Sequence, residues 1–352
     1  MRALAAATAI AVAATGAGPI AVTPAQAQRA GGAMPIIRDT EMEQLLRDYA
    51  QPILKAAGLA KQNVKVVVLN DRAFNAFVMD GRHIFINAGA LFDAKTPNEV
   101  IGVFAHETGH LAGGHLLKLR EQLATAQTAS VIALLLGVGA AVGSSRMGSG
   151  GGDIGAAAIM APQSAIQRSL LAYVRTQEDQ ADHAGVKFLN ATGQSPRGML
   201  ELFKRLGSES LFNSRYIDPY MQTHPMPAER VASLEVLAKA SPYFDQKDSA
   251  ALQARHDLMR AKLSGFLERP DTVARRYPLG DHSLAARYAR AISTYRHGDL
   301  RQAVAQIDGL IQAQPGDPYF YELKGQALLE GGRANEAVAP LRQAIAQKSL
   351  DL

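Results

Sequence analysis

Two histidines four residues apart, His106 and His110, place the strongest single constraint on how this chain folds. On an α-helix, residues at this spacing lie about one turn apart on the same face, so both imidazoles point in the same direction. That arrangement suits two nitrogen ligands of a tetrahedral zinc, and Glu107 is placed to act as a general base. Apolar neighbours predict a buried helix, where unpaired imidazoles would be costly. These neighbours are Val100, Ile101, Val103, Phe104 and Leu111.

The alternative is a helix that carries two solvated or core-bound histidines and no metal. The chain has nine histidines in 352 residues, so the pattern H-E-x-x-H alone is only moderately specific. The zinc interpretation therefore needs further ligands.

The N-terminus has the composition of an export signal. Arg2 supplies a short positive region, residues 3–22 are apolar or small, and Ala25-Gln26-Ala27 matches an A-x-A cleavage site. We expect a signal peptide at 1–27, cleaved before Gln28, and a location in the bacterial periplasm. An N-terminal membrane anchor is the alternative, but glycine and proline interrupt the apolar run. The interrupting residues are Gly16, Gly18, Pro19 and Pro24.

Composition bounds the rest of the chain. A length of 352 residues with 47% hydrophobic content is enough for two domains with their own cores. There is no cysteine, which excludes disulfides and a lipid-modified cysteine. Cleavage of the signal removes only Arg2 from 37 basic residues, which leaves 36 against 32 acidic ones. This mild, dispersed excess gives no reason to expect a nucleic-acid partner.

The segment before the histidine pair predicts a helix, a strand and a hairpin. Asp39 or Thr40 can cap a helix that ends at Gly58, and residues 64–69 form an apolar run typical of a buried strand.

The hairpin is predicted by Asp80-Gly81, a strong two-residue turn signal, between apolar runs at 75–79 and 82–87. One of its strands could form an edge open to an extended peptide. An ordinary edge with no substrate role remains the alternative.

We predict one helix from about Pro97 to Leu123 around the histidine pair. On that helix His115 lies about 180° from His106 and cannot join the same metal without a break. Gly113-Gly114 could provide a break, but the third ligand position of the metzincin pattern falls on Leu116. We therefore expect His115 to have a structural role or to contact a metal-binding residue without binding the metal itself.

A glycine-rich region follows. Residues 131–142 are apolar, and residues 143–155 are rich in glycine and serine. Twelve apolar residues are too few to span a bilayer. Two interpretations remain open: a mobile lid or flap, with peripheral membrane contact through 131–160, or a buried helix end followed by a disordered loop.

A second helix, predicted from about Ser164 to Asn190, offers carboxylates. Glu178 and Asp182 are four residues apart and share a face. A zinc site with two histidines needs a third protein ligand and an open water position. A carboxylate can also hold a ligating histidine by its other ring nitrogen. On spacing alone, an ordinary surface pair is the more common arrangement.

Three motifs, in this order and at these separations, resemble one family. They are His106-Glu107-Thr108-Gly109-His110, Glu178-Asp179-Gln180-Ala181-Asp182 and His224-Pro225-Met226-Pro227-Ala228-Glu229-Arg230. Asn75-Ala76-Phe77 also resembles the family's N-A-F element. The chain is thereby similar to the gluzincin metallopeptidases that include the CAAX prenyl proteases and HtpX-like enzymes, and most of all to the soluble, periplasmic BepA-like branch. The resemblance covers about Asp39 to Arg276.

The resemblance implies a metal centre. His106, His110 and Glu178 would bind one zinc ion per chain, and Glu107 would activate water. Asp182 would not bind the zinc itself but would hold a metal-binding histidine in place.

The resemblance also implies residues of a substrate cleft. His224 and Arg230 would face it and stabilise the tetrahedral intermediate or gate access. His224 could instead fill the open position of the zinc and keep the enzyme latent, or be an ordinary capping or surface histidine. Asn75 and Phe77 would contact the substrate. Membrane members of the family carry long spanning helices, and this sequence shows none, so prenylated substrates are not implied.

The tail contains a repeat of 34 residues, which aligns Ala291 with Gly325 and Gly298 with Gly332. Period and small-residue placement are similar to tetratricopeptide repeats, in which paired helices stack into a concave surface. Residues 250–276 are predicted to be helical, as a degenerate earlier unit. So few repeats are marginal alone, and we expect them to dock on the preceding domain. A plain helical bundle is the alternative.

We therefore predict a mainly α protein, with an α+β zinc metallopeptidase domain at 28–245 that holds a small β-sheet, and a helical repeat domain at 246–352. The resemblance implies a periplasmic zinc endopeptidase of protein or peptide substrates. It would act with the outer-membrane protein assembly machinery and degrade misassembled proteins, and its repeats would recruit clients. The alternative is a repeat-based chaperone or adaptor with a latent protease. A structural zinc is disfavoured, because such sites are closed and usually contain cysteine.

Overall fold

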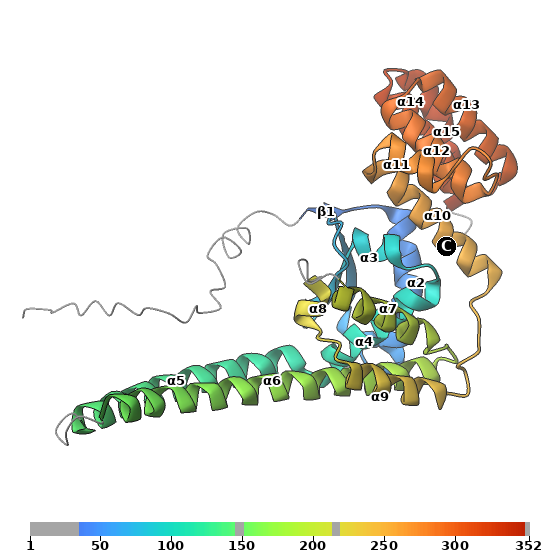
Figure 1. Ribbon diagram of the computed structural model, residues 1–352. Helices are drawn as coiled ribbons and strands as arrows, with labels where there is room; N and C mark the ends of the chain where they lie inside the picture. The colour runs from blue at the N-terminus through green and yellow to red at the C-terminus, as the bar shows by residue number, and fades with distance from the viewer. Residues whose placement is uncertain (1–34, 145–150, 213–218, 349–352) are drawn as a thin grey trace, which may run out of the picture. The chain divides into compact units, whose positions relative to one another are not determined.

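A computed structural model of the protein describes residues 35–144, 151–212 and 219–348 (Figure 1). The predicted signal peptide, 1–27, and its cleavage point before Gln28 lie outside the described residues. Helices dominate and the strands form one small sheet, which confirms the predicted mainly α fold. The strands are β1 (Ile36–Ile37), β2 (Lys65–Leu69), β3 (Ala76–Asp80) and β4 (His83–Asn87). The helices before the tail are α2 (Thr40–Ala56), the 3₁₀ turn η2 (Ala60–Gln62), α3 (Ala88–Asp93), α4 (Pro97–Gly113), α5 (His115–Ser144), α6 (Gly151–Ala191), α7 (Arg197–Phe212), α8 (Pro219–Thr223) and α9 (Ala228–Lys239).

The strands form a single sheet in the order β1-β2-β4-β3. β2 and β4 are parallel, while β3 and β4 form the antiparallel hairpin that the Asp80-Gly81 turn predicts. In that hairpin Phe77 pairs with Phe85, and their rings stack with centroids 5.2 Å apart. β3 is therefore an edge strand, with one side of its backbone free of a neighbouring strand in this sheet.

Helix α4 lies in the middle of the core, against α2, α6, α7 and the sheet (Figure 1). The side chain of Thr96 caps its first turn by accepting a hydrogen bond from the Glu99 N–H, and Pro97 stands at the first helical position. Apart from its C-terminal end, α4 is buried on all sides. The histidine pair is thus carried by the most enclosed helix in this core, which confirms the predicted burial.

The single helix predicted from Pro97 to Leu123 is wrong. α4 ends at Gly113, and Gly114 takes a left-handed conformation with φ +62°. Its N–H caps the helix by bonding to the carbonyl oxygens of His110 and Leu111. The chain changes direction there, and α5 starts at His115. Glycine adopts this conformation without the steric cost that a side chain would impose.

Helices α5 and α6 run side by side over most of their length (Figure 1). The predicted start of the second helix at Ser164 is wrong, because α6 begins at Gly151. The predicted loop at 143–155 is correspondingly shorter, and residues 145–150 lie outside the described residues. Within 35–144, 151–212 and 219–348, no helix is both long and apolar enough to cross a membrane.

The tail forms pairs of helices. They are α10 (Ala250–Leu267), α11 (Pro270–Arg276), α12 (Leu284–His297), α13 (Leu300–Ala313), α14 (Pro318–Glu330) and α15 (Ala334–Lys348). α14 begins 34 residues after α12, and α15 begins 34 residues after α13, as the sequence period predicts. A Cβ added to Gly325 would lie 2.4 Å from Leu341 Cγ, so glycine is required where α14 meets α15. The structure confirms a helical repeat; its assignment to the tetratricopeptide type stays a prediction.

Helix α10 joins the tail to the preceding core. Its Met259 and Leu263 pack with the core around α4, and Leu258 and Ala261 pack with the core of the repeats. Lys262 on the same helix forms ion pairs with Asp39 and Glu41 at the start of α2. The docking that we expected is therefore present, while the domain boundary at 245/246 stays a prediction.

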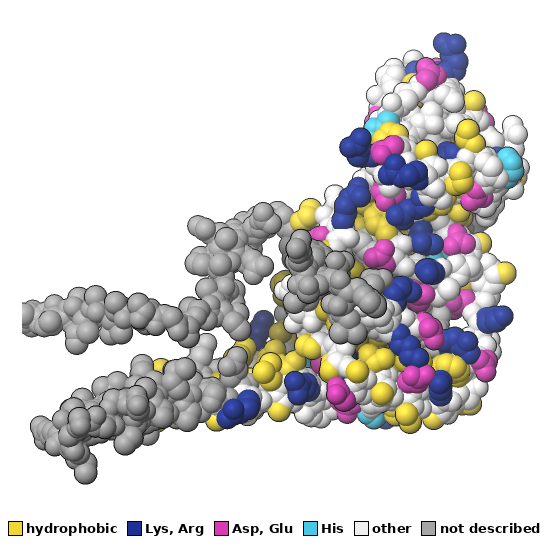
Figure 2. All heavy atoms as spheres, viewed as in Figure 1, with side chains coloured by type: hydrophobic (Ala, Val, Ile, Leu, Met, Phe, Trp, Pro, Cys, Tyr) yellow, Lys and Arg dark blue, Asp and Glu magenta, His cyan; other side chains and the backbone are white. Residues whose placement is uncertain are grey.

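Surface charge is mixed. Figure 2 shows basic and acidic side chains interspersed over the described part of one face of the molecule. Such interspersion is typical of a solvated protein surface.

His256 gives the fold a measurable response to acid. It is fully buried on α10, where Tyr49 Oη lies 3.2 Å from its Nδ1 and the Ala94 carbonyl oxygen lies 3.0 Å from its Nε2. Burial lowers the pKa of His256 to about 4, from an ordinary value of 6.5. The unfolded chain therefore takes up a proton on this ring at a pH where the folded protein does not.

Because the folded pKa lies below the unfolded one, the contribution of His256 to stability is complete above pH 6.5 and is lost as the pH falls toward 4. Between about pH 7.5 and pH 5, we expect the free energy of unfolding to drop by about 2 kcal/mol more in the native protein than in His256→Gln. Denaturant titrations at both pH values measure this difference. Equal drops in the two proteins would contradict the assignment.

Candidate metal centre

The centre depends on a close approach of α4 to α6. A Cβ added to Gly109 would lie 2.7 Å from the carbonyl oxygen of Ala181, and one added to Gly185 would lie 3.3 Å from the carbonyl carbon of Ala105. The two helices therefore pack with glycine in the contact. This packing sets His106 and His110 of α4 opposite the carboxylates of α6.

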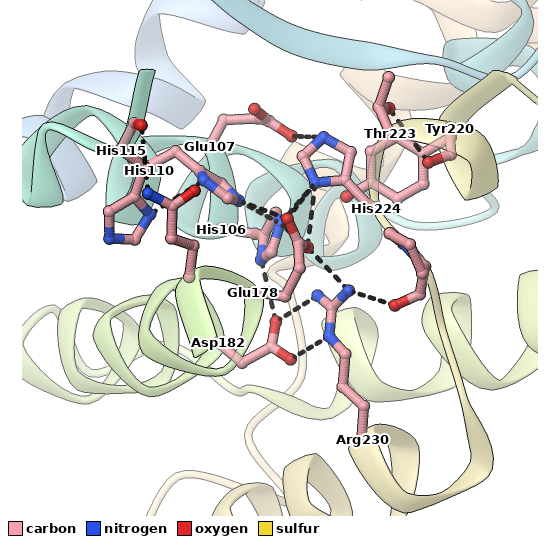
Figure 3. Close-up of polar contacts among 12 residues, drawn as sticks. His106, Glu107, His110, His115, Glu178, Asp182, Tyr220, Thr223, His224 and Arg230 are labelled. Atoms are coloured by element: carbon pink, nitrogen blue, oxygen red, sulfur yellow. Dashed lines mark hydrogen bonds and ion pairs between the residues drawn. The ribbon is translucent and has the colours of Figure 1, made fainter. Parts of the chain in front are cut away.

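Four side chains present ligand atoms within 4.8 Å of one another: His106, His110, Glu178 and His224 (Figure 3). The two histidine Nε2 atoms are 3.0 Å apart, and Glu178 Oε1 and Oε2 lie 3.4 and 3.5 Å from His110 and His106 Nε2. His224 Nδ1 lies 3.3 Å from His106 Nε2 and 3.1 Å from Glu178 Oε2. The structure thus brings together the three predicted metal ligands and adds His224 to them.

Asp182 and Arg230 lie behind the ligands. Asp182 Oδ1 is 2.9 Å from His106 Nδ1, and both oxygens of Asp182 accept hydrogen bonds from the Arg230 guanidinium, at 2.7 and 2.8 Å. A third guanidinium nitrogen lies 2.8 Å from Glu178 Oε2. Burial raises the pKa of Asp182, but the hydrogen bonds from Arg230 and His106 outweigh it and hold that pKa below its ordinary value.

These residues fit a zinc ion. With Asp182 accepting the Nδ1 proton of His106, the Nε2 lone pair of that ring faces the centre, beside the Nε2 of His110. Two lone pairs at that separation repel each other unless a cation lies between them. Ligands about 2.0–2.1 Å from a tetrahedral zinc are about 3.3 Å apart, close to the distances found here. Burial holds the pKa of His110 well below its ordinary value, so this ring is neutral, as a ligand must be.

Glu107 lies beside the four candidate metal ligands but does not belong to that group. It is buried, and within the described part of the chain neither carboxylate oxygen has a hydrogen-bond partner. Among the described residues its one ion-pair contact is with His224, whose Nε2 lies 3.6 Å from Oε1. Burial raises the pKa of Glu107 above its ordinary value. A buried carboxylate of raised pKa with no bound partner has the properties of a general base.

A cleft of about 750 Å³ opens on this group. The edge strand β3 borders it through Phe77, Val78 and Met79, opposite Glu107 and His110. Asn75 is not among the residues that line the cleft; its backbone carbonyl accepts a hydrogen bond from the Asn87 N–H. Of the two predicted substrate contacts, the structure therefore brings only Phe77 to the cleft.

Two aromatic residues of the site were not predicted. The ring of Tyr220, on α8, packs against His224 at a tilt of 34° with centroids 4.6 Å apart, and the ring of Phe203, on α7, meets His106 edge-on at 5.4 Å. His224 is only 6% exposed, so the alternative of a surface histidine is wrong. Neither aromatic residue belongs to a local sequence pattern that indicates a chemical role, so the sequence alone could not place them at the site.

Residues 37–238 match the sequence model of peptidase family M48. The chain belongs to this family. Its members are zinc-dependent metallopeptidases, so by family the chain is a zinc metalloprotease with zinc as its cofactor.

Three relatives illustrate the similarity. The beta-barrel assembly-enhancing protease of Escherichia coli (strain K12) is 24% identical over 322 residues, which are 89% of this chain and 63% of that protein. A putative beta-barrel assembly-enhancing protease of Vibrio cholerae is 26% identical over 208 residues, 59% of this chain and 41% of that one. Metalloprotease YcaL of Escherichia coli (strain K12) is 27% identical over 194 residues, 52% and 67% of the two chains. The chain thus spans less than two thirds of the first of these relatives.

Gly109→Ala tests whether the helix contact forms the centre. The added methyl group would meet the carbonyl oxygen of Ala181 at 2.7 Å and its Cα at 2.9 Å, so α4 and α6 must move apart. We expect zinc affinity to fall by about tenfold or more, because ligands on the two helices lose their shared position.

Competition with a fluorescent chelator measures that affinity. Gly309→Ala is the control, since it also adds a methyl group to a helix but meets only the end of the flexible Arg287 side chain. Equal zinc affinity in Gly109→Ala and the native protein would show that the close approach is not needed.

Proposed function

We propose that the protein is a zinc endopeptidase of the periplasm that acts on outer-membrane proteins during their assembly and degrades those that misassemble. The observation that carries this proposal is the position of Glu107, a buried carboxylate without a hydrogen bond from the described residues, which lines the cleft beside the candidate metal ligands. The names of the Escherichia coli and Vibrio cholerae relatives support the link to β-barrel assembly. The predicted signal peptide supports the compartment.

In this proposal His106, His110 and Glu178 bind the zinc, as their mutual distances allow. A bound zinc polarises the scissile carbonyl and lowers the pKa of a water molecule to about 7. Glu107 takes the proton of the attacking water and delivers it to the leaving amine. Because the site is buried, a proton moved within it stays close to the reacting atoms.

His224 has two possible roles, and its position favours one. Nδ1 lies within the donor set, 3.1 Å from Glu178 Oε2 and 3.3 Å from His106 Nε2. A histidine at that place occupies the position that water needs, so we propose that the structure represents a closed, latent state. Stabilisation of the tetrahedral intermediate requires His224 to move outward toward the cleft.

Arg230 supports the ligands in this proposal. Its guanidinium bonds Asp182 and Glu178 and also donates to the carbonyl oxygen of Pro225, next to His224. It therefore links the ligand helix α6 with the segment that carries His224. The role in stabilising the intermediate, which the family resemblance implies, stays a prediction.

We propose that the substrate binds as an extended segment along β3. The free edge of this strand offers backbone N–H and C=O groups, and the side chains of Phe77, Val78 and Met79 lie at the cleft. Much of the remaining lining is apolar, with Leu111, Leu116, Leu117 and Val174 among the residues. Strands of an unassembled β-barrel are extended and carry alternating apolar side chains, which suits such a surface. Asn75 directly precedes β3, and its predicted role in substrate binding would be to fix the backbone at the start of that strand.

Two further parts of the proposal concern partners. The helical repeats α12–α15 would select protein clients and bind the assembly machinery, as stacked helix pairs provide a large binding surface. Residues 131–160 would touch the membrane surface; Val131 and Ile132 are exposed at the start of that segment.

A repeat-based chaperone with a latent protease is the second candidate. The observation in its favour is the same His224, which stands among the donors. The two candidates differ in whether Glu107 is needed for the protein's function.

Glu107→Gln separates them. Glutamine keeps the size of the side chain but cannot take a proton, so we expect hydrolysis of a denatured β-barrel protein to fall by about 100-fold or more. Zinc content should remain at one per chain, because Glu107 is not among the clustered donors. Peptide release and metal analysis on the same sample give both numbers. Full function of Glu107→Gln in cells would favour the chaperone.

His224→Ala tests the closed state. Removing the imidazole frees the fourth position, so we expect a several-fold rise in hydrolysis together with a weaker hold on zinc, since one donor is lost. The assay is the same peptide release at saturating zinc. Thr223→Ala, a change on the neighbouring residue, is the control. A fall in hydrolysis with zinc bound would instead assign His224 to the intermediate.

A further inference from the structure

We propose that His115 is a positioning residue of the metal centre, which holds His110 through its outer ring nitrogen. This inference rests on the zinc centre of the proposed function. His115 follows the metal-binding motif in the sequence but lies on a different helix, and its ring packs against the second histidine of the pair (Figure 3).

The contact is a ring-to-ring hydrogen bond. His115 Nδ1 lies 3.0 Å from His110 Nδ1, and the two rings meet edge-on at 85° with centroids 4.9 Å apart. His115 is 4% exposed, so water does not compete freely for this bond. One of the two nitrogens must carry the proton and the other must accept it.

The need for His110 to bind the metal decides which of its ring nitrogens carries the proton. A neutral imidazole has one N–H. The Nε2 of His110 faces the other metal ligands and must be unprotonated to bind the metal, so the proton of this ring lies on Nδ1. That N–H donates to His115 Nδ1, and His115 carries its own proton on Nε2. A histidine ligand whose other nitrogen is fixed in this way keeps both its tautomer and its ring orientation.

The two ligands of α4 are therefore supported differently. His106 is held by Asp182, a carboxylate that is itself bonded to Arg230. His110 is held by a second imidazole. A neutral acceptor orients the ring without adding negative charge to a buried centre that already contains Glu107, Glu178 and Asp182.

The break between the helices is what brings His115 to this place. On a continuous helix its side chain would point about 180° away from His106. The left-handed Gly114 ends α4, and the first residue of α5 then turns back toward the motif. Gln177 of α6 donates to the His115 carbonyl oxygen at 3.2 Å and fixes the backbone there.

Gly113 supplies independent evidence that the ring is held in this position. A Cβ at Gly113 would lie 2.2 Å from His115 Nε2 and 2.6 Å from its Cδ2. Any side chain at 113 would displace the ring from His110. The two glycines thus have separate effects: Gly114 allows the turn, and Gly113 leaves the space that the imidazole fills.

The test compares two substitutions that separate hydrogen bonding from packing. His115→Asn keeps an acceptor oxygen at the place of Nδ1 but loses most of the ring, while His115→Leu fills similar space and offers no acceptor. If His115 positions His110, His115→Leu should lower zinc affinity by about 10- to 100-fold and His115→Asn should retain most of it. Chelator competition measures the affinity without relying on proteolysis.

A double substitution extends the test. Gly113→Ala should lower zinc affinity as His115→Leu does, because it displaces the ring. In the His115→Ala background the same change should have little further effect, since no ring remains to be displaced. Visible absorption of the cobalt-substituted proteins reports whether the ligand geometry has changed, and circular dichroism confirms that each variant is folded.

The outcomes separate this inference from the proposed function. Native zinc affinity in His115→Leu, or loss of affinity in His115→Asn alone, would overturn the positioning role and leave a packing role. Absence of zinc from the folded native protein would instead overturn the proposed function.

Discussion

The buried contact of Arg230 with Asp182 and Glu178 is the interaction on which the rest of the centre depends. These carboxylates lie one turn apart on α6, and both are almost fully buried. Without a cation beside them their mutual repulsion and loss of hydration would favour protonation or exposure, and breaking such a buried arrangement typically costs about 3–5 kcal/mol. Arg230 bonds both of them and so allows two negative groups to face the histidines. The metal centre is thus assembled around a fixed positive charge that comes from a different segment of the chain.

Backbone contact is the second requirement, and it explains why small residues recur in α4. Gly109, next to His110, faces the backbone of α6 at Ala181. Gly102 faces α7, where an added Cβ would lie only 2.6 Å from Met199 Cβ. α4 therefore lies close to two helices at once. That closeness buries the histidines and sets the ligand distances, so the stability of the core and the geometry of the centre are produced by the same packing.

Much of this arrangement could be predicted from the sequence because it is encoded locally. The Asp80-Gly81 turn, the capped amphipathic helix α2 and the 34-residue period each depend on residues that are near one another in the chain. The end of α4 was missed because apolar periodicity continues past it, and only the left-handed Gly114 stops the helix. The sequence does not predict the start of α6 at Gly151, because the glycine and serine residues at 143–155 favour a loop. Tyr220 and Phe203 reach the centre through tertiary packing alone, which no local pattern reveals.

The contacts of His224 explain how a latent centre can open without being dismantled. Its segment is held by the tilted ring contact of Tyr220 with the imidazole and by the bond from Arg230 to the Pro225 carbonyl oxygen. The other bonds of Arg230, to Asp182 and Glu178, do not involve that segment. Outward movement of His224 gives up its contacts with Tyr220, Glu178 and His106, while the bonds of Arg230 to Asp182 and Glu178 stay in place. Access to the centre and integrity of the centre are thus governed by different bonds of the same arginine.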